Sequence, residues 1–168
     1  MRIEWLNKKG SDRVIVFFHG WGMDAAGVSH LQMEDDVLMC YDYRSLDFAF
    51  PDLGYYRCIY VVAWSMGVWA ASQVLDRSCL PITESVAVNG TMTPVDDSRG
   101  IPNAIYEGTL KGLNDVTLRK FFRRMCGSAV LLEDFLTRSP GRSTDEVKEE
   151  LLLIAKQAEC LAPARFCW

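Results

Sequence analysis

Short apolar runs, each followed by a turn, occupy the first half of the chain. Four of them, Arg13–Phe18, Asp36–Tyr41, Cys58–Ala63 and Glu84–Val88, are rich in β-branched and aromatic residues. Runs that are apolar on both faces are typical of strands in a covered parallel sheet. The Ala-, Val- and Leu-rich segment Val68–Arg77 between the last two runs predicts a buried helix.

The turns between these runs carry glycine and a capping residue. Gly20 and Gly22 end the first strand, and Asp24 predicts a helix that continues to about Leu31. Strands that alternate with helices predict an α/β fold with a doubly wound, mostly parallel sheet in three layers. Ligands of such sheets bind at the carboxyl ends of the strands, so the residues there are the candidates for function.

After Pro94 the pattern changes to a polar loop, Val95–Asn103, and then to helical periodicity. Helices are predicted over Ile105–Gly112, Asp115–Met125, Ala129–Thr137 and Thr144–Leu161. Ser143 is the expected N-cap of the last helix. We expect one domain over residues 1–168, with a sheet core at 1–94 and a helical lid at 95–162 over the strand ends.

Composition excludes several classes of function. The 168 residues carry a net charge of -4, which argues against nucleic-acid binding through a basic surface. None of the six cysteines forms a C-x-x-C pair, so no metal or cofactor is expected. The N-terminal segment Met1–Ser11 has charges throughout and no apolar signal-peptide core, and no stretch approaches the length of a membrane span. We therefore expect a monomeric, cytoplasmic protein with free thiols and no membrane partner.

Ala63-Trp64-Ser65-Met66-Gly67 lies between a predicted strand and a predicted helix. This context is that of a nucleophile elbow, in which a strained turn lifts the serine oxygen out of the sheet. Small residues two positions before and after Ser65 allow the strand and the helix to approach closely; alanine replaces the usual first glycine. Ser65 is therefore the candidate nucleophile, and the alternative is a serine that only caps the helix.

The loop after the first strand, His19-Gly20-Trp21-Gly22, is the second candidate element. An oxyanion hole in this fold needs the backbone N–H of the residue after the nucleophile and one from this earlier loop. Met66 and Trp21 hold those two positions. His19, Gly20, Gly22 and Trp64 are expected to shape the loop and contact substrate, with His19 serving as a structural turn residue.

A catalytic base is not evident. Serine needs a base at neutral pH, and in α/β hydrolases the histidine follows the nucleophile and the acid. Both histidines, His19 and His30, precede Ser65, and His30 is expected on the surface of the first helix. Asp97, beside Asp96, is the candidate acid; an ordinary polar loop is the alternative there.

A local basic segment, Arg119-Lys120-Phe121-Phe122-Arg123-Arg124, contrasts with the acidic chain. At helical spacing Arg119 and Arg123 share one face, and Lys120 and Arg124 share another. The segment predicts a contact with an acidic partner or an anionic substrate, although an ordinary solvated face is equally consistent with it.

Five segments together carry a resemblance to a known family: Phe18–Asp24, Ala63–Ala71, Val88–Thr91, Gly100–Pro102 and Phe121–Cys126. They resemble the BioG-type pimeloyl-acyl carrier protein methyl ester esterases of biotin synthesis, over nearly the whole chain. The resemblance implies an α/β-hydrolase fold with a reduced lid. It also implies hydrolysis of the methyl ester of pimeloyl-acyl carrier protein, with Ser65 as nucleophile and Trp21 and Met66 as oxyanion donors.

The resemblance also implies a departure at the end of the chain. Family members continue beyond Trp168 with another strand, an acidic residue and the catalytic histidine, so we expect the 168 residues alone to be inactive. Two alternatives stay open: a general acyl esterase or thioesterase, and a noncatalytic remnant that binds acyl groups or a carrier protein.

Overall fold

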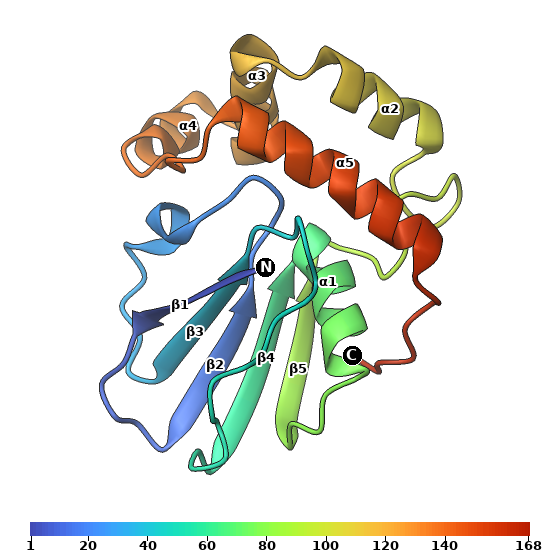
Figure 1. The fold of residues 1–168 in the computed structure, drawn as a ribbon. Coiled ribbons are helices and arrows are strands. Elements are labelled where there is room, and N and C mark those ends of the chain that lie inside the picture. The colour runs from blue at the N-terminus through green and yellow to red at the C-terminus, as the bar shows by residue number, and fades with distance from the viewer.

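A computed structural model describes residues 1–168, which form a five-stranded sheet with five α-helices (Figure 1). The strands are β1 (Arg2–Asn7), β2 (Arg13–Phe18), β3 (Asp36–Tyr41), β4 (Cys58–Trp64) and β5 (Ile82–Val88). Their order across the sheet is β1-β3-β2-β4-β5. β1 is antiparallel to β3, and the other neighbouring pairs are parallel. The predicted mostly parallel sheet is therefore confirmed.

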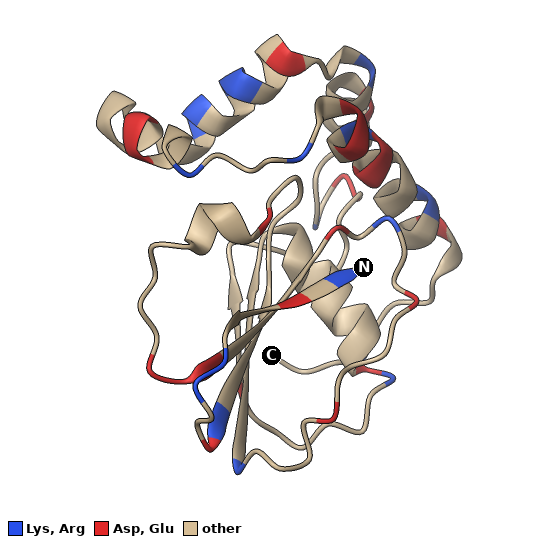
Figure 2. Cartoon of the chain, turned by 60° about the vertical axis from the view of Figure 1, so that its left-hand side comes forward, with Lys and Arg blue, Asp and Glu red and all other residues tan.

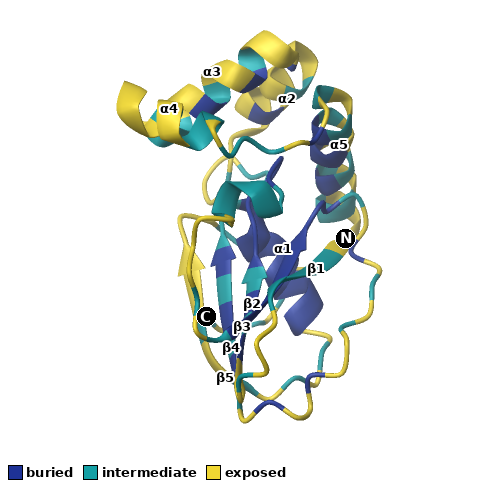
Figure 3. Ribbon diagram, turned by 90° about the vertical axis from the view of Figure 1, so that its left-hand side faces the viewer, coloured by how far each residue is buried: buried dark blue, intermediate teal, exposed yellow.

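The two faces of the sheet differ in how they are covered (Figure 3). Val14, Val16, Phe18, Val61 and Ala63 alternate along β2 and β4 and are all buried. Helix α1 (Met66–Leu75), whose ten residues are all buried, supplies the apolar layer on one side of the sheet. On the other side the intervening residues of β2 and β4 are half-buried, and β5 exposes Val86 and Val88. Within these residues, the sheet thus has a helix layer on one face only. The predicted three-layer arrangement is incomplete here, because the helix predicted after β2 is only the 3-10 turn Ala25–Val28.

The helices of the second half lie above the carboxyl ends of the parallel strands (Figure 1). They are α2 (Asn103–Gly112), α3 (Asp115–Cys126), α4 (Ala129–Leu136) and α5 (Thr144–Cys160). The side chains of Asn114, Ser128 and Ser143 cap α3, α4 and α5 by accepting bonds from first-turn amides. This arrangement places a helical cover over the strand ends.

Charged residues are sparse on the central strands and are frequent on the covering helices and on the loops at the sheet's lower end (Figure 2). No helix combines the length and the apolar character needed to cross a membrane.

One local prediction was wrong, and one strand was not predicted. The helix predicted from Asp24 to about Leu31 is one turn of 3-10 helix, Ala25–Val28, so His30 lies in the following turn. Asp24 does cap this turn, but Gly27 disfavours continuation and the Ser29 hydroxyl bonds back to the Ala26 carbonyl. The strand that was not predicted is β1, an antiparallel edge strand in which polar and apolar residues alternate only from Arg2 to Trp5.

Candidate active site

Ser65 is the single residue between the end of β4 and the start of α1. Its backbone has φ 56° and ψ −124°, a conformation that costs a non-glycine residue about 1–3 kcal/mol. Its N–H donates to the Val88 carbonyl at 3.0 Å, and its own carbonyl accepts from the Val68 N–H at 3.0 Å. The side chain makes no capping bond to the helix, so Ser65 is not simply a helix cap.

Two glycines, Gly67 and Gly90, allow this turn because each lies in close contact with the backbone of a neighbouring segment. A Cβ on Gly67 would lie 2.3 Å from the Phe18 carbonyl oxygen and 2.6 Å from that of His19. A Cβ on Gly90 would lie 2.3 Å from the carbonyl oxygen of Ser65 itself. No side chain fits at such distances, so the packing of the strand, the helix and the β5 end requires glycine at both positions.

A cavity of about 810 Å³ opens over Ser65, between the strand ends and the covering helices. Twelve of its 20 lining residues are hydrophobic, which suits an apolar ligand with few polar groups. Helices α2 and α3 contribute Ile105, Tyr106, Phe121 and Met125. Ser65 and Arg124 are among its polar members.

Two backbone amides at this cavity are available to a ligand. Trp21 and Met66 both line it together with Ser65. The Trp21 N–H donates no hydrogen bond within the chain. The Met66 N–H belongs to the first turn of α1, where a helix has no internal acceptor and the helix dipole favours negative charge. The two amides have the character required of oxyanion donors.

His19 lies outside the group that lines this cavity. It is 3% exposed and packs against Phe17 and Trp64, and its Nδ1 accepts from the Gly20 N–H at 2.8 Å. Burial lowers the pKa of His19 to about 4, so the ring is neutral at pH 7. The structure thus gives His19 a place in the turn and no bond to Ser65.

The remaining sequence candidates are dispersed. Gly20 and Trp64 line the cavity, whereas Gly22 lies beside Val147 of α5. Asp97 is exposed and accepts from the Asn103 N–H at the start of α2, a capping contact without a partner histidine. His30 is exposed and also makes no bond to Ser65.

The basic segment forms one exposed surface on α3. Arg119, Lys120, Arg123 and Arg124 are all exposed and have no ion-pair partner in the chain. The ribbon of α3 carries blue bands for Lys and Arg in Figure 2. Arg124 also lines the cavity, so this cationic surface reaches the cavity that holds Ser65.

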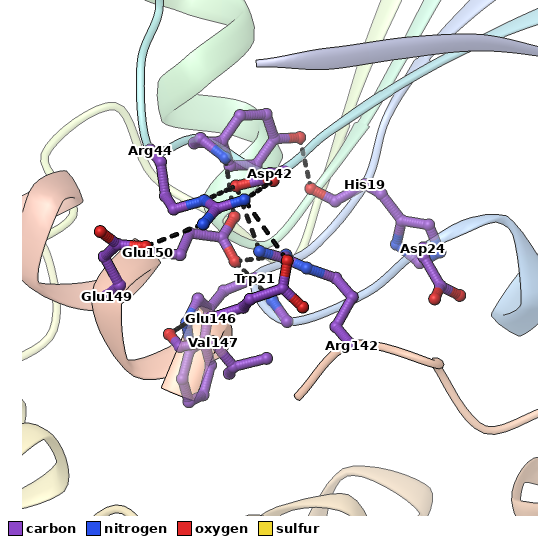
Figure 4. A network of polar contacts seen from close by, with 12 residues as sticks. His19, Trp21, Asp24, Asp42, Arg44, Arg142, Glu146, Val147, Glu149 and Glu150 are labelled. Atoms are coloured by element: carbon purple, nitrogen blue, oxygen red, sulfur yellow. Dashed lines mark hydrogen bonds and ion pairs between the residues drawn. The ribbon is translucent and has the colours of Figure 1, made fainter. Parts of the chain in front are cut away.

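Sequence reasoning missed a buried ionic cluster beside the His19–Gly22 loop (Figure 4). Arg142 pairs with Glu150 at 2.6 Å and with Asp42 at 3.1 Å, and all three side chains are nearly inaccessible to solvent. Burial raises the pKa of Glu150, and Arg142 opposes this effect. A signal existed: Glu150 lies on the apolar stripe of α5 with Val147, Leu151 and Ile154, where a carboxylate needs a partner.

The fold is of the α/β-hydrolase type. A solved lipase-esterase related protein from Clostridium acetobutylicum shares the fold, with a TM-score of 0.57 over 92% of this chain and 70% of that one, at 14% identity. The chain belongs to the pimeloyl-acyl carrier protein methyl esterase family, BioG, whose family model matches residues 1–159.

Individual relatives agree with this membership. The crystal structure of BioG from Haemophilus influenzae has a TM-score of 0.85 and 40% identity, covering 96% of this chain and 74% of that one. A malonyl-acyl carrier protein O-methyltransferase of Bacteroides fragilis is 56% identical over 155 residues, which are 92% of this chain. The match spans 32% of that relative, about a third of its length.

Proposed function

We propose that the protein is a serine esterase that hydrolyses the methyl ester of pimeloyl-acyl carrier protein in biotin synthesis. The observation that supports it most directly is Ser65, held at positive φ beneath an apolar cavity and accompanied by the amides of Trp21 and Met66. Family membership supports the choice of substrate.

In this proposal the Ser65 hydroxyl oxygen attacks the ester carbonyl carbon while a base takes its proton. The oxyanion accepts hydrogen bonds from the N–H groups of Trp21 and Met66. The tetrahedral intermediate collapses, and methanol leaves with the proton that the base returns. A water molecule then attacks the acyl-enzyme in the same way, which releases the free carboxylate and restores Ser65.

The base is proposed to be a histidine outside residues 1–168, oriented by an acidic residue that also lies outside them. Neither His19 nor His30 bonds to Ser65, and His19 already accepts the Gly20 N–H. This chain covers 74% of H. influenzae BioG, so that relative has further residues among which a histidine and an acid could lie. We propose that without a base these 168 residues have almost no activity.

The cavity and α3 suit the two ends of the substrate. Hydrophobic residues such as Ile105, Phe121 and Met125 would surround the methylene chain next to the reacting ester. The unpaired cations of α3 would meet the acidic carrier protein and the phosphate of its phosphopantetheine arm. Arg124 would lie where the acyl chain leaves the cavity.

The test is hydrolysis of pimeloyl-carrier methyl ester by the full-length protein and by two variants, followed by mass spectrometry of the carrier. Ser65→Ala is expected to lower kcat by about 10⁴-fold or more, because it removes the nucleophile. Ser78→Ala, beyond the end of α1, is the matched control and retains the activity of the parent. Full activity of Ser65→Ala would refute the proposal.

A second candidate is a noncatalytic domain that binds acyl groups or a carrier protein. The absence of a bond between Ser65 and either histidine favours it. This candidate predicts carrier binding without turnover in the full-length protein. A third, a general acyl esterase or thioesterase, predicts that short aryl esters or thioesters are cleaved at least as efficiently as the carrier-bound methyl ester.

A further inference from the structure

The loop that carries the Trp21 amide is held from outside by three anchors (Figure 4). The indole Nε1 of Trp21 donates to the Val147 carbonyl at 2.8 Å. The Gly22 N–H donates to Glu150 Oε2 at 3.2 Å. The Tyr43 hydroxyl donates to the His19 carbonyl at 2.6 Å. Two of the anchors, Val147 and Glu150, are one turn apart on α5, so this helix holds both the Trp21 side chain and the Trp21–Gly22 peptide.

Glu150 joins these anchors into one cluster. Its other oxygen, Oε1, accepts from the Tyr43 N–H at 2.8 Å, so one carboxylate contacts the oxyanion loop and the segment after β3. Arg142 Nη1 donates to Glu150 Oε2 at 2.6 Å, and its Nη2 lies 3.1 Å from Asp42. Since Glu150 is fully buried, the direction of its carboxylate is fixed by these partners alone.

The backbone at Gly22 explains why the orientation of the Glu150 carboxylate affects the Trp21 amide. Gly22 has φ 74°, and a Cβ there would lie 3.1 Å from a methyl group of Val147. The Gly22 N–H in this turn donates to Glu150 of α5. Trp21, one residue earlier, lines the Ser65 cavity, and its own N–H has no partner in the chain. Rotation of one peptide in so tight a turn would move the other.

We propose that Glu150, oriented by Arg142, is a positioning residue that holds the Trp21 amide toward the Ser65 cavity. The proposal rests on the esterase function proposed above. It links the helical cover to the oxyanion site, because α5 belongs to the cover and Trp21 follows the central strand β2. Glu150 touches neither substrate nor Ser65, and it acts through the Gly22 peptide.

The test compares Glu150→Gln with Glu149→Gln in the full-length protein. The first change keeps the volume but removes the charge that pairs with Arg142; the second makes the same change on the adjacent, exposed residue. For Glu150→Gln we expect kcat to fall by about 10- to 100-fold with KM changed less than about threefold, because oxyanion stabilisation acts on the transition state. Glu149→Gln is expected to match the parent.

A second readout follows the loop without catalysis. The indole N–H resonance of Trp21, assigned with Trp21→Phe, is expected to shift in Glu150→Gln and to stay in place in Glu149→Gln. If Glu150→Gln does not fold, Arg142→Lys is tested in its place. Lysine keeps the positive charge but cannot contact Glu150 and Asp42 with two separate nitrogens, as Arg142 does. For this variant we expect kcat to fall by about 3- to 10-fold.

The outcomes separate the two proposals. If Ser65→Ala is inactive while folded Glu150→Gln, or Arg142→Lys in its place, keeps the kcat of the parent, the positioning role is overturned and the esterase stands. If Ser65→Ala keeps full activity, the esterase proposal itself fails.

Discussion

Ser65 combines two features: a β-to-α turn at positive φ and a hydroxyl without an intramolecular partner. The sequence predicted this turn because Ala63, Gly67 and the flanking apolar runs leave few other conformations for Trp64-Ser65-Met66. The close approach of Gly90 to the Ser65 carbonyl was not predictable, since it depends on how β5 pairs with β4.

His19 gives a prediction at the same scale. Burial lowers its pKa from 6.5 to about 4, so the unfolded chain binds this proton first and stability is lost as the pH falls from about 6.5 toward 4. Between pH 7 and pH 4.5 this single group should remove about 2–3 kcal/mol from the free energy of unfolding.

Urea unfolding at both pH values checks this, with His19→Asn as the comparison. Asn keeps an acceptor for the Gly20 N–H but does not titrate. The free energy of unfolding of His19→Asn should therefore fall by about 2–3 kcal/mol less between the two pH values than that of the parent. Carboxylates titrate in both proteins and cancel in the difference. An equal loss in both would show that His19 is not buried in its neutral form.

Glu150 and Arg142 mark the limit of prediction at single positions. The prediction of a helix over Thr144–Leu161 singled out neither residue. Only the tertiary structure shows that Glu150, besides pairing with Arg142, bonds to Gly22 and Tyr43, more than 100 residues away.

At the scale of elements, the sequence predicted β2 and β3 at their observed bounds, and the helices after Pro94 within about two residues. Their caps and apolar periods are local signals, and local signals are readable without the fold. β1 was missed because six residues with charged alternate positions resemble a polar terminus until β3 pairs with them.

The exposed cations of α3 are predicted to contribute to the binding of the carrier-bound substrate. Replacing Arg123 with Glu should raise KM for the carrier-bound methyl ester by about 3- to 10-fold and make it less sensitive to salt, because an attraction becomes a repulsion. Activity on a small methyl ester without a carrier should change less than about twofold.

Lys156→Glu on α5 is the matched control, since Lys156 is equally exposed and makes no ion pair, yet lies off this surface. Steady-state kinetics at low and high salt measure the change in KM and its dependence on salt. Equal effects of the two reversals would mean that net charge, and not α3, sets the interaction.

At the scale of the whole molecule, the parallel sheet and its helical cover were predictable from alternating periods, and the cavity over Ser65 follows from that topology. The unequal covering of the two sheet faces was not predictable, because half-buried Phe17 and Val62 have the same apolar character as fully buried Val16 and Val61. The dispersal of Asp97 and both histidines from Ser65 likewise required the fold.

The central claim is that Ser65 is an activated nucleophile, and reaction of the full-length protein with a fluorophosphonate tests it most directly. Intact-mass and peptide mass spectrometry should show one adduct, located on Ser65, that is absent from Ser65→Ala and present in Ser78→Ala. No adduct on the folded full-length protein, or an adduct on another residue, would contradict the account.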